Sequence, residues 1–155
     1  MVDYNRVLVY KSIPSENGVD ADFIIGQINF TSYERGTNTK NFEKKMQVAN
    51  MMAINDILYI PDTINNRIVG FDISTLKNGP HAKYVFGQMD FVTSASKWSK
   101  NGEAGARDGS MLGNLSMPKG IYQDIDGHIW ISDYDHNRVI KLEQNDLAGF
   151  QIENI

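Results

Sequence analysis

The sequence contains no cysteine, and this absence excludes disulfide bonds, thiolate chemistry and cysteine-ligated zinc. Lysine and arginine (15) are outnumbered by aspartate and glutamate (19) and form no dense basic run, so nucleic acid is not an expected partner. No apolar run reaches the ~18 residues of a membrane span, so a membrane is not an expected partner either. The N-terminus, MVDYNRVLVYK, has no signal-peptide pattern. The compartment stays open, including secretion of a longer parent chain.

Histidine is scarce, with only three in the chain. A zinc centre needs three converging ligands. His128 and His136 are expected in turns at opposite ends of one strand, and His81 lies far away in the sequence, so no such centre is expected. Nucleophile-elbow, phosphate-loop and dinucleotide-binding motifs are also missing. The sequence therefore predicts no cofactor and no catalytic residue.

A partial calcium-loop spacing occurs at Asp133-x-Asp135-x-Asn137. The pattern fails after this start, because the loop requires glycine at its sixth position and a bidentate glutamate at its twelfth. Those positions hold Arg138 and Gln144. We therefore expect no metal site of this type. The nearby Asp-Ile-Asp-Gly stretch at 124–127 is interpreted as a hairpin turn.

One phrase occurs three times: DTINNRIVGF at 62–71, DYDHNRVIKL at 133–142 and, less completely, MVDYNRVLVY at 1–10. The arginines of the three copies are 61 and 71 residues apart. Twenty residues after the arginine, the first two units carry Gly-Gln, and a phenylalanine follows four residues after that glycine. Such a shared register indicates repeated architecture. The residues that define it are Arg6, Arg67, Arg138, Gly26, Gly87, Phe30 and Phe91.

Short runs of β-branched and aromatic residues, separated by turn residues, predict strands in every unit, and no stretch has a helical period. The predicted first strands of a unit are 49–54 and 119–125, and the second strands are 57–61 and 128–132. The third strands are 67–72 and 138–143, and the fourth strands are 23–30 and 83–91. Four short antiparallel strands per unit are typical of a β-propeller blade. The fold is therefore predicted to be an all-β propeller of four-stranded blades, with long polar links at 31–46 and 92–116.

Each repeated phrase places an aspartate at the end of the second strand and an arginine at the start of the third. Across a loop of four residues, these groups can form a charge-assisted pair that holds the loop, with the preceding asparagine at positive φ. The predicted structural pairs are Asp62 with Arg67 and Asp133 with Arg138. The alternative is that these groups are polar ligand contacts on the face of the propeller. Tyr59 and Trp130, in matching positions, are expected to pack between adjacent blades.

The stretches DTINNRIVGFD and DGHIWISDYDHNRVIKL resemble the NHL-repeat family of β-propellers. The stretch NRVLVYKSIPSENGVDADFIIGQINFTS is similar to the long-blade bacterial members, which carry a Gly-Gln-x-Asp/Asn-Phe outer strand. The resemblance covers about residues 2–143. The family's Pro-x-Gly start of the first strand is present at 118–120, whereas the previous unit has Gln-Val-Ala at 47–49.

On this pattern, residues 1–155 form a single partial propeller of about two and a half blades. Residues 1–30 are the end of one blade, 44–91 a full blade, and 116–155 the first three strands of another, with at most one further strand. Such an arc leaves apolar faces and strand edges exposed. We therefore expect either a fragment of a longer propeller or self-association that completes the circle.

The loops after the second strand and the links after the fourth strand emerge on the same face of a propeller. The predicted binding residues on that face are Trp98, Tyr134, His136, Asn65 and Asp135. The resemblance implies a non-enzymatic binding or scaffold module that takes a protein or a glycan. The alternative is part of a propeller enzyme of lyase or lactonase type, since similar propellers hold a metal on the axis. In that case the metal ligands must come from outside this chain.

Overall fold

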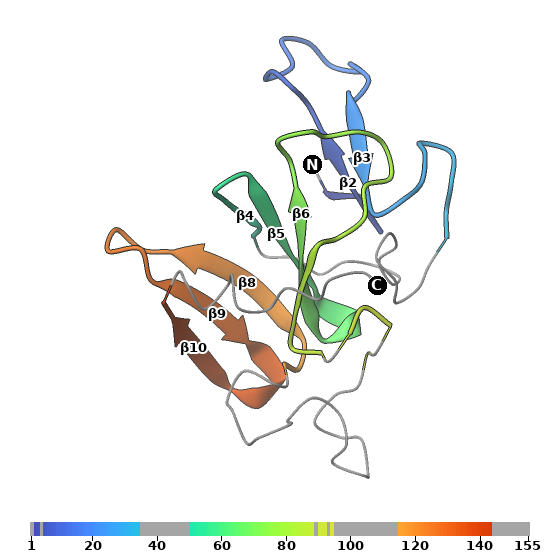
Figure 1. Ribbon diagram of the computed structural model, residues 1–155. Coiled ribbons are helices and arrows are strands. Elements are labelled where there is room, and N and C mark those ends of the chain that lie inside the picture. Colours follow the sequence, from blue (N-terminus) through green and yellow to red (C-terminus); the bar gives the residue numbers. More distant parts are fainter. Residues whose placement is uncertain are drawn as a thin grey trace.

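The computed structural model describes residues 2–3, 5–34, 50–88, 90–92, 94 and 115–143 of the chain. These residues form three small antiparallel sheets and contain no α-helix (Figure 1). The prediction of an all-β fold is confirmed. In the same described segments, no helix is long and apolar enough to cross a membrane.

The sheets follow one another along the chain, and we name them by position. The N-terminal sheet has the order β1 (Val2–Asp3), β2 (Arg6–Val9), β3 (Phe23–Ile25). The central sheet has the order β4 (Met52–Ile54), β5 (Ile57–Asp62), β6 (Arg67–Asp72), β7 (Tyr84–Phe86). The C-terminal sheet consists of β8 (Pro118–Gln123), β9 (Ile129–Asp133) and β10 (Arg138–Leu142), with β9 in the middle. Two 3-10 helices, η1 (Thr63–Asn65) and η2 (Tyr134–His136), join β5 to β6 and β9 to β10.

The central sheet is buried on both faces, because its strands place apolar side chains alternately on the two sides. In β6, Ile68 packs toward the C-terminal sheet, whereas Val69 packs toward the N-terminal sheet. Each side contributes to one apolar cluster. The C-terminal cluster is Ile54, Tyr59, Ile68, Phe86, Leu115, Ile121, Ile129, Ile131, Ile140 and Leu142. The N-terminal cluster is Val7, Ile25, Ile60, Val69, Phe71, Ala82, Val85 and Phe91. The three sheets are therefore packed in series, as Figure 1 shows.

Positive backbone angles form the tight turns between strands. Asn55 and Asp56 have φ of 47° and 61°, the combination that a two-residue type I′ hairpin turn requires, and they join β4 to β5. Asn66 and Asn137, with φ of 54° and 52°, end η1 and η2 and turn the chain into β6 and β10. Asparagine tolerates this region better than most residues. The predicted positive φ of both asparagines is confirmed.

The outer strands β3 and β7 have three residues each and end sooner than the predicted ranges 23–30 and 83–91. Each is followed by a glycine at positive φ, Gly26 at 90° and Gly87 at 83°, which takes the chain out of the extended conformation. At Gly87, a Cβ atom would lie 2.6 Å from the Leu115 side chain, so this glycine also permits close packing. The Gly-Gln pair thus ends the strand instead of lying within it.

The structure also contains β1, which the sequence analysis did not expect. It pairs with β2 through Val2 opposite Val7 and Asp3 opposite Arg6. The first copy of the repeated phrase therefore contains a tight hairpin, with two residues between the paired strands. The four-residue loops of the other two copies each form a 3-10 turn instead.

Candidate binding face

The two complete copies of the repeated phrase form the same loop. In the first loop, Asp62 Oδ2 accepts hydrogen bonds from Arg67 Nε and Asn65 Nδ2, both at 2.8 Å. In the second, Asp133 Oδ2 lies 2.7 Å from both Arg138 Nε and His136 Nδ1. Both ion pairs expected from the sequence are present. Asn65 and His136 occupy the same position and both contact the aspartate, a role that the sequence analysis did not assign to them.

The repeated Gly-Gln and Phe positions have a role that the sequence pattern alone did not suggest. In the central unit, Gln88 Nε2 donates to the Asn66 carbonyl at 2.9 Å, and Arg67 Nη1 donates to the Phe91 carbonyl. In the N-terminal unit, Gln27 Nε2 donates to the Asn5 carbonyl at 3.4 Å, and Arg6 Nη1 donates to the Phe30 carbonyl at 2.9 Å. These two bonds, which we call the latch, tie the segment after the outer strand to the Asn-Arg pair. The signal in the sequence was the offset of twenty residues from the arginine to the Gly-Gln pair, which both units share.

The segment before β8 joins the two loops to each other. Met117 N donates to the Asn66 side-chain oxygen at 2.9 Å, and Thr63 Oγ1 donates to the Pro118 carbonyl at 2.8 Å. On the other side, Ser116 N donates to Asp133 Oδ1 at 2.7 Å. Residues 116–118 thus lie between the loops and fix both of them. The arrangement is a rigid polar framework, since most of these groups are buried.

Above this framework, several side chains reach solvent. The Tyr134 residue is 56% exposed, and Lys119 Nζ lies 3.7 Å from the centre of its ring, in a cation–π contact. Asp135 Oδ2 accepts a bond from Ser116 Oγ at 3.4 Å, and the His136 side chain is 16% exposed. We define the loop face as five residues that reach the surface on the two loops and at the start of β8. These residues are Ile64, Lys119, Tyr134, Asp135 and His136.

The structure places the predicted binding residues in different surroundings. Tyr134, Asp135 and His136 lie together on the loop face as members of the second loop. Asn65 belongs to the first loop but is only 2% exposed, because its amide points back to Asp62. Trp98 lies outside the described residues.

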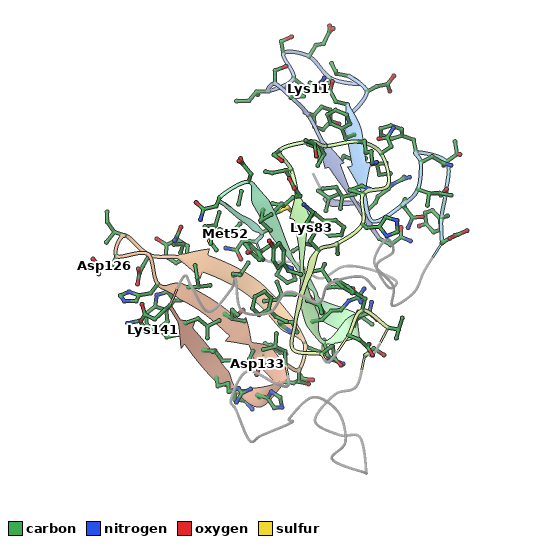
Figure 2. All side chains as sticks on the ribbon, viewed as in Figure 1. Lys11, Met52, Lys83, Asp126, Asp133 and Lys141 are labelled. Carbon is green, nitrogen blue, oxygen red and sulfur yellow. The ribbon has the colours of Figure 1, made fainter. Side chains whose placement is uncertain are left out.

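At the opposite end of β9, the turn 124–128, where Asp126 is labelled in Figure 2, is organised around the carboxylate of Asp124. Asp124 Oδ1 accepts bonds from the backbone N–H groups of Asp126 and His128, at 3.0 and 2.9 Å. Asp124 Oδ2 lies 2.8 Å from the Trp130 indole nitrogen and 3.1 Å from His128 Nδ1. These bonds lower the pKa of Asp124 from 3.8 to about 2, with the Trp130 bond the largest cause.

The same turn contains the one group of ligand-type side chains in the described segments that could hold a metal ion, Asp124, Asp126 and His128. Their potential ligand atoms lie within 4.8 Å of one another. Asp124 already accepts from several donors, as a hairpin-closing aspartate does. Gly127, at φ 88°, completes the turn. The interpretation of this stretch as a hairpin turn is confirmed.

Comparisons of the chain with protein-family models, with curated proteins and with solved structures find no match.

Proposed function

We propose that the chain is a non-enzymatic binding or scaffold module, an NHL-type propeller arc that binds a protein or a glycan through its loop face. The observation that carries this proposal is the exposed Tyr134 ring, which contacts the Lys119 ammonium and belongs to a loop that the Asp133 carboxylate holds in place. A rigid aromatic side chain loses little conformational entropy on binding, and such anchors contribute much of the affinity at recognition surfaces.

The propeller arrangement has its own support. Three antiparallel sheets pack face to face in chain order, and the latch occurs in the N-terminal and central units with the same donors and acceptors. In a propeller, blades repeat around an axis and their connecting loops gather on one face. The bonds of residues 116–118 to both loops are the kind of contact that adjacent blades require on such a face.

Chemistry on the loop face favours binding over catalysis. The carboxylates of Asp62 and Asp133 are buried and bonded to arginine, so they serve the loops. The side chains left for a partner are an aromatic ring, a cation and peripheral polar groups. The enzyme alternative would take its metal ligands from outside this chain, and none of the contacts described above supports it.

The test is a pair of matched tyrosine variants. A displayed peptide library and a glycan array, each probed with the full chain, identify candidate ligands. We expect Tyr134→Ala to weaken binding of a selected ligand at least about tenfold, the loss typical of an aromatic anchor. Tyr33→Ala is the control, because Tyr33 is similarly exposed, at 54%, and is not part of the loop face.

The triple replacement of Trp98, Tyr134 and His136 extends the test to the other residues predicted from the sequence. Circular dichroism must show an intact β fold in each variant. The proposal is wrong if neither library gives a ligand, or if every ligand binds the Tyr134 and triple variants as tightly as the wild type.

A further inference from the structure

The outer face of the C-terminal sheet exposes a group of apolar side chains. Tyr122 is 60% exposed, Trp130 36% and Val139 65%. They come from the three adjacent strands, and Tyr122 and Trp130 are direct cross-strand partners. Lys141, which is labelled in Figure 2, is the cross-strand partner of Trp130, and its Nζ lies 5.7 Å from the centre of the Trp130 ring. Clustered exposed apolar groups of this kind are typical of interaction surfaces.

The repeated sequence shows that this outer face corresponds to a buried face of the central sheet. Trp130 occupies the position of Tyr59, three residues before the loop aspartate, and Val139 occupies the position of Ile68, directly after the loop arginine. In the central sheet, Tyr59 and Ile68 are 5% and 0% exposed, because they pack against the C-terminal sheet. The exposed face therefore has the pattern of a face that binds the next sheet.

The outer face of the N-terminal sheet has the reciprocal pattern. Leu8 and Tyr10 occupy the positions of Val69 and Phe71, which in the central sheet pack toward the preceding N-terminal sheet. Here Leu8 and Tyr10 instead line an open hollow of about 580 Å³. The other residues that line it are Arg6, Val19, Asp20, Ala21 and Phe30.

The two outer faces are thus the two halves of the contact that the chain already makes twice internally. We propose that the outer face of the C-terminal sheet in one copy binds the outer face of the N-terminal sheet in a second copy, head to tail. The occupant follows from the repeat. Within the chain, the face equivalent to the C-terminal outer face binds the sheet that follows it, and the face equivalent to the N-terminal outer face binds the sheet that precedes it.

A head-to-tail contact joins two different surfaces, so it continues from copy to copy until a ring closes or an open chain grows. This inference does not depend on ligand binding by the loop face. Tyr134 belongs to neither outer face, and its replacement should leave self-association unchanged. Failure of either proposal can therefore be recognised separately.

The first measurement is solution mass against concentration, by sedimentation or light scattering of the full chain. We expect a mass that rises above the 17.5 kDa of one copy as the concentration increases. Val139→Arg should return the mass to one copy, since it places a charge within the apolar contact. Ile125→Arg is the control, because Ile125 is fully exposed in the turn between β8 and β9, away from the outer face. A constant 17.5 kDa for the wild type, or no effect of Val139→Arg, overturns the proposal.

Mixing two variants tests the direction of the contact. Val19→Arg blocks the hollow on the N-terminal sheet, where Val19 is 42% exposed, and leaves the C-terminal sheet intact. We expect Val19→Arg and Val139→Arg each to have the mass of one copy when measured alone. When the two variants are mixed, they should form a dimer that does not grow further. If both variants remain single after mixing, or if Val19→Arg alone associates like the wild type, the head-to-tail contact is wrong. Circular dichroism of each variant checks the fold.

Discussion

Arg67 and Arg138 make the same ion pair in very different surroundings, which allows their contributions to stability to be compared. The Arg67 side chain is 0% exposed and its partner Asp62 2%, whereas Arg138 is 33% exposed beside a fully buried Asp133. Removing one member of a buried pair leaves a charge without its partner or water. At the second site, water can approach the loop in place of the arginine.

We therefore predict that Arg67→Met lowers the free energy of unfolding by about 3–5 kcal/mol, the range for breaking a buried pair. Arg138→Met should cost less than Arg67→Met, because water can reach the half-exposed Arg138 site and Asp133 keeps its contacts with Ser116 N and His136 Nδ1. Urea unfolding followed by circular dichroism measures both. Equal losses would mean that burial does not determine the importance of this pair.

The sequence predicts both aspartate–arginine ion pairs, but it does not predict the other hydrogen bonds around each aspartate. The spacing of Asp62 and Arg67 across a four-residue loop predicts their contact, because the ends of a hairpin loop are adjacent. Spacing does not reveal that the third loop residue turns back onto the aspartate, since this depends on the 3-10 geometry. Asn65 was therefore interpreted as a surface contact, although a hydrogen-bond donor occurs at this position in both loops.

At the level of elements, strand positions were predictable and strand lengths were not. β5, β6, β9 and β10 lie within one residue of the predicted ranges, because β-branched runs between turn residues mark them clearly. β3 and β7 end early, since a glycine at positive φ follows each of them. A sequence gives no backbone angle for glycine, so the Gly-Gln pair was assigned to the strand. The hairpin partner β1 was missed because two residues carry too little pattern.

The turn between β8 and β9 gives a prediction about pH. Asp124 has a pKa of about 2 in the folded chain instead of 3.8, first because the Trp130 indole donates to it. A lowered carboxylate pKa means that the ionised form stabilises the fold. This contribution is complete above about pH 4 and is lost as the pH falls toward 2.

A carbon-detected NMR titration of the Asp124 carboxyl group tests this assignment. We expect a midpoint near 2 in the wild type and a clear rise toward 3.8 in Trp130→Phe, which removes the indole donor but keeps an aromatic ring. Tyr122→Phe, a change on the strand opposite Trp130, should leave the midpoint in place. A wild-type midpoint near 3.8 would show that these bonds do not favour the ionised form.

In the molecule as a whole, the central sheet depends on both neighbours and each neighbour depends on it. Ile68 and Val69 are adjacent in β6, yet one belongs to the C-terminal cluster and the other to the N-terminal cluster. Opening the central sheet must therefore separate both clusters, whereas opening an outer sheet separates only one. Stability should decrease from the centre of the described segments outward.

Amide hydrogen exchange measures this gradient strand by strand. At a concentration where the solution mass is that of one copy, we predict the slowest exchange in β5 and β6 and faster exchange in β10, whose Val139 is 65% exposed. Raising the concentration should slow exchange in β10 and β2 selectively, because the head-to-tail contact would cover the two outer sheets. The turn at Ile125 lies outside that contact and should not change. Uniform protection at low concentration would contradict the gradient, and concentration-independent exchange in β10 would contradict the contact.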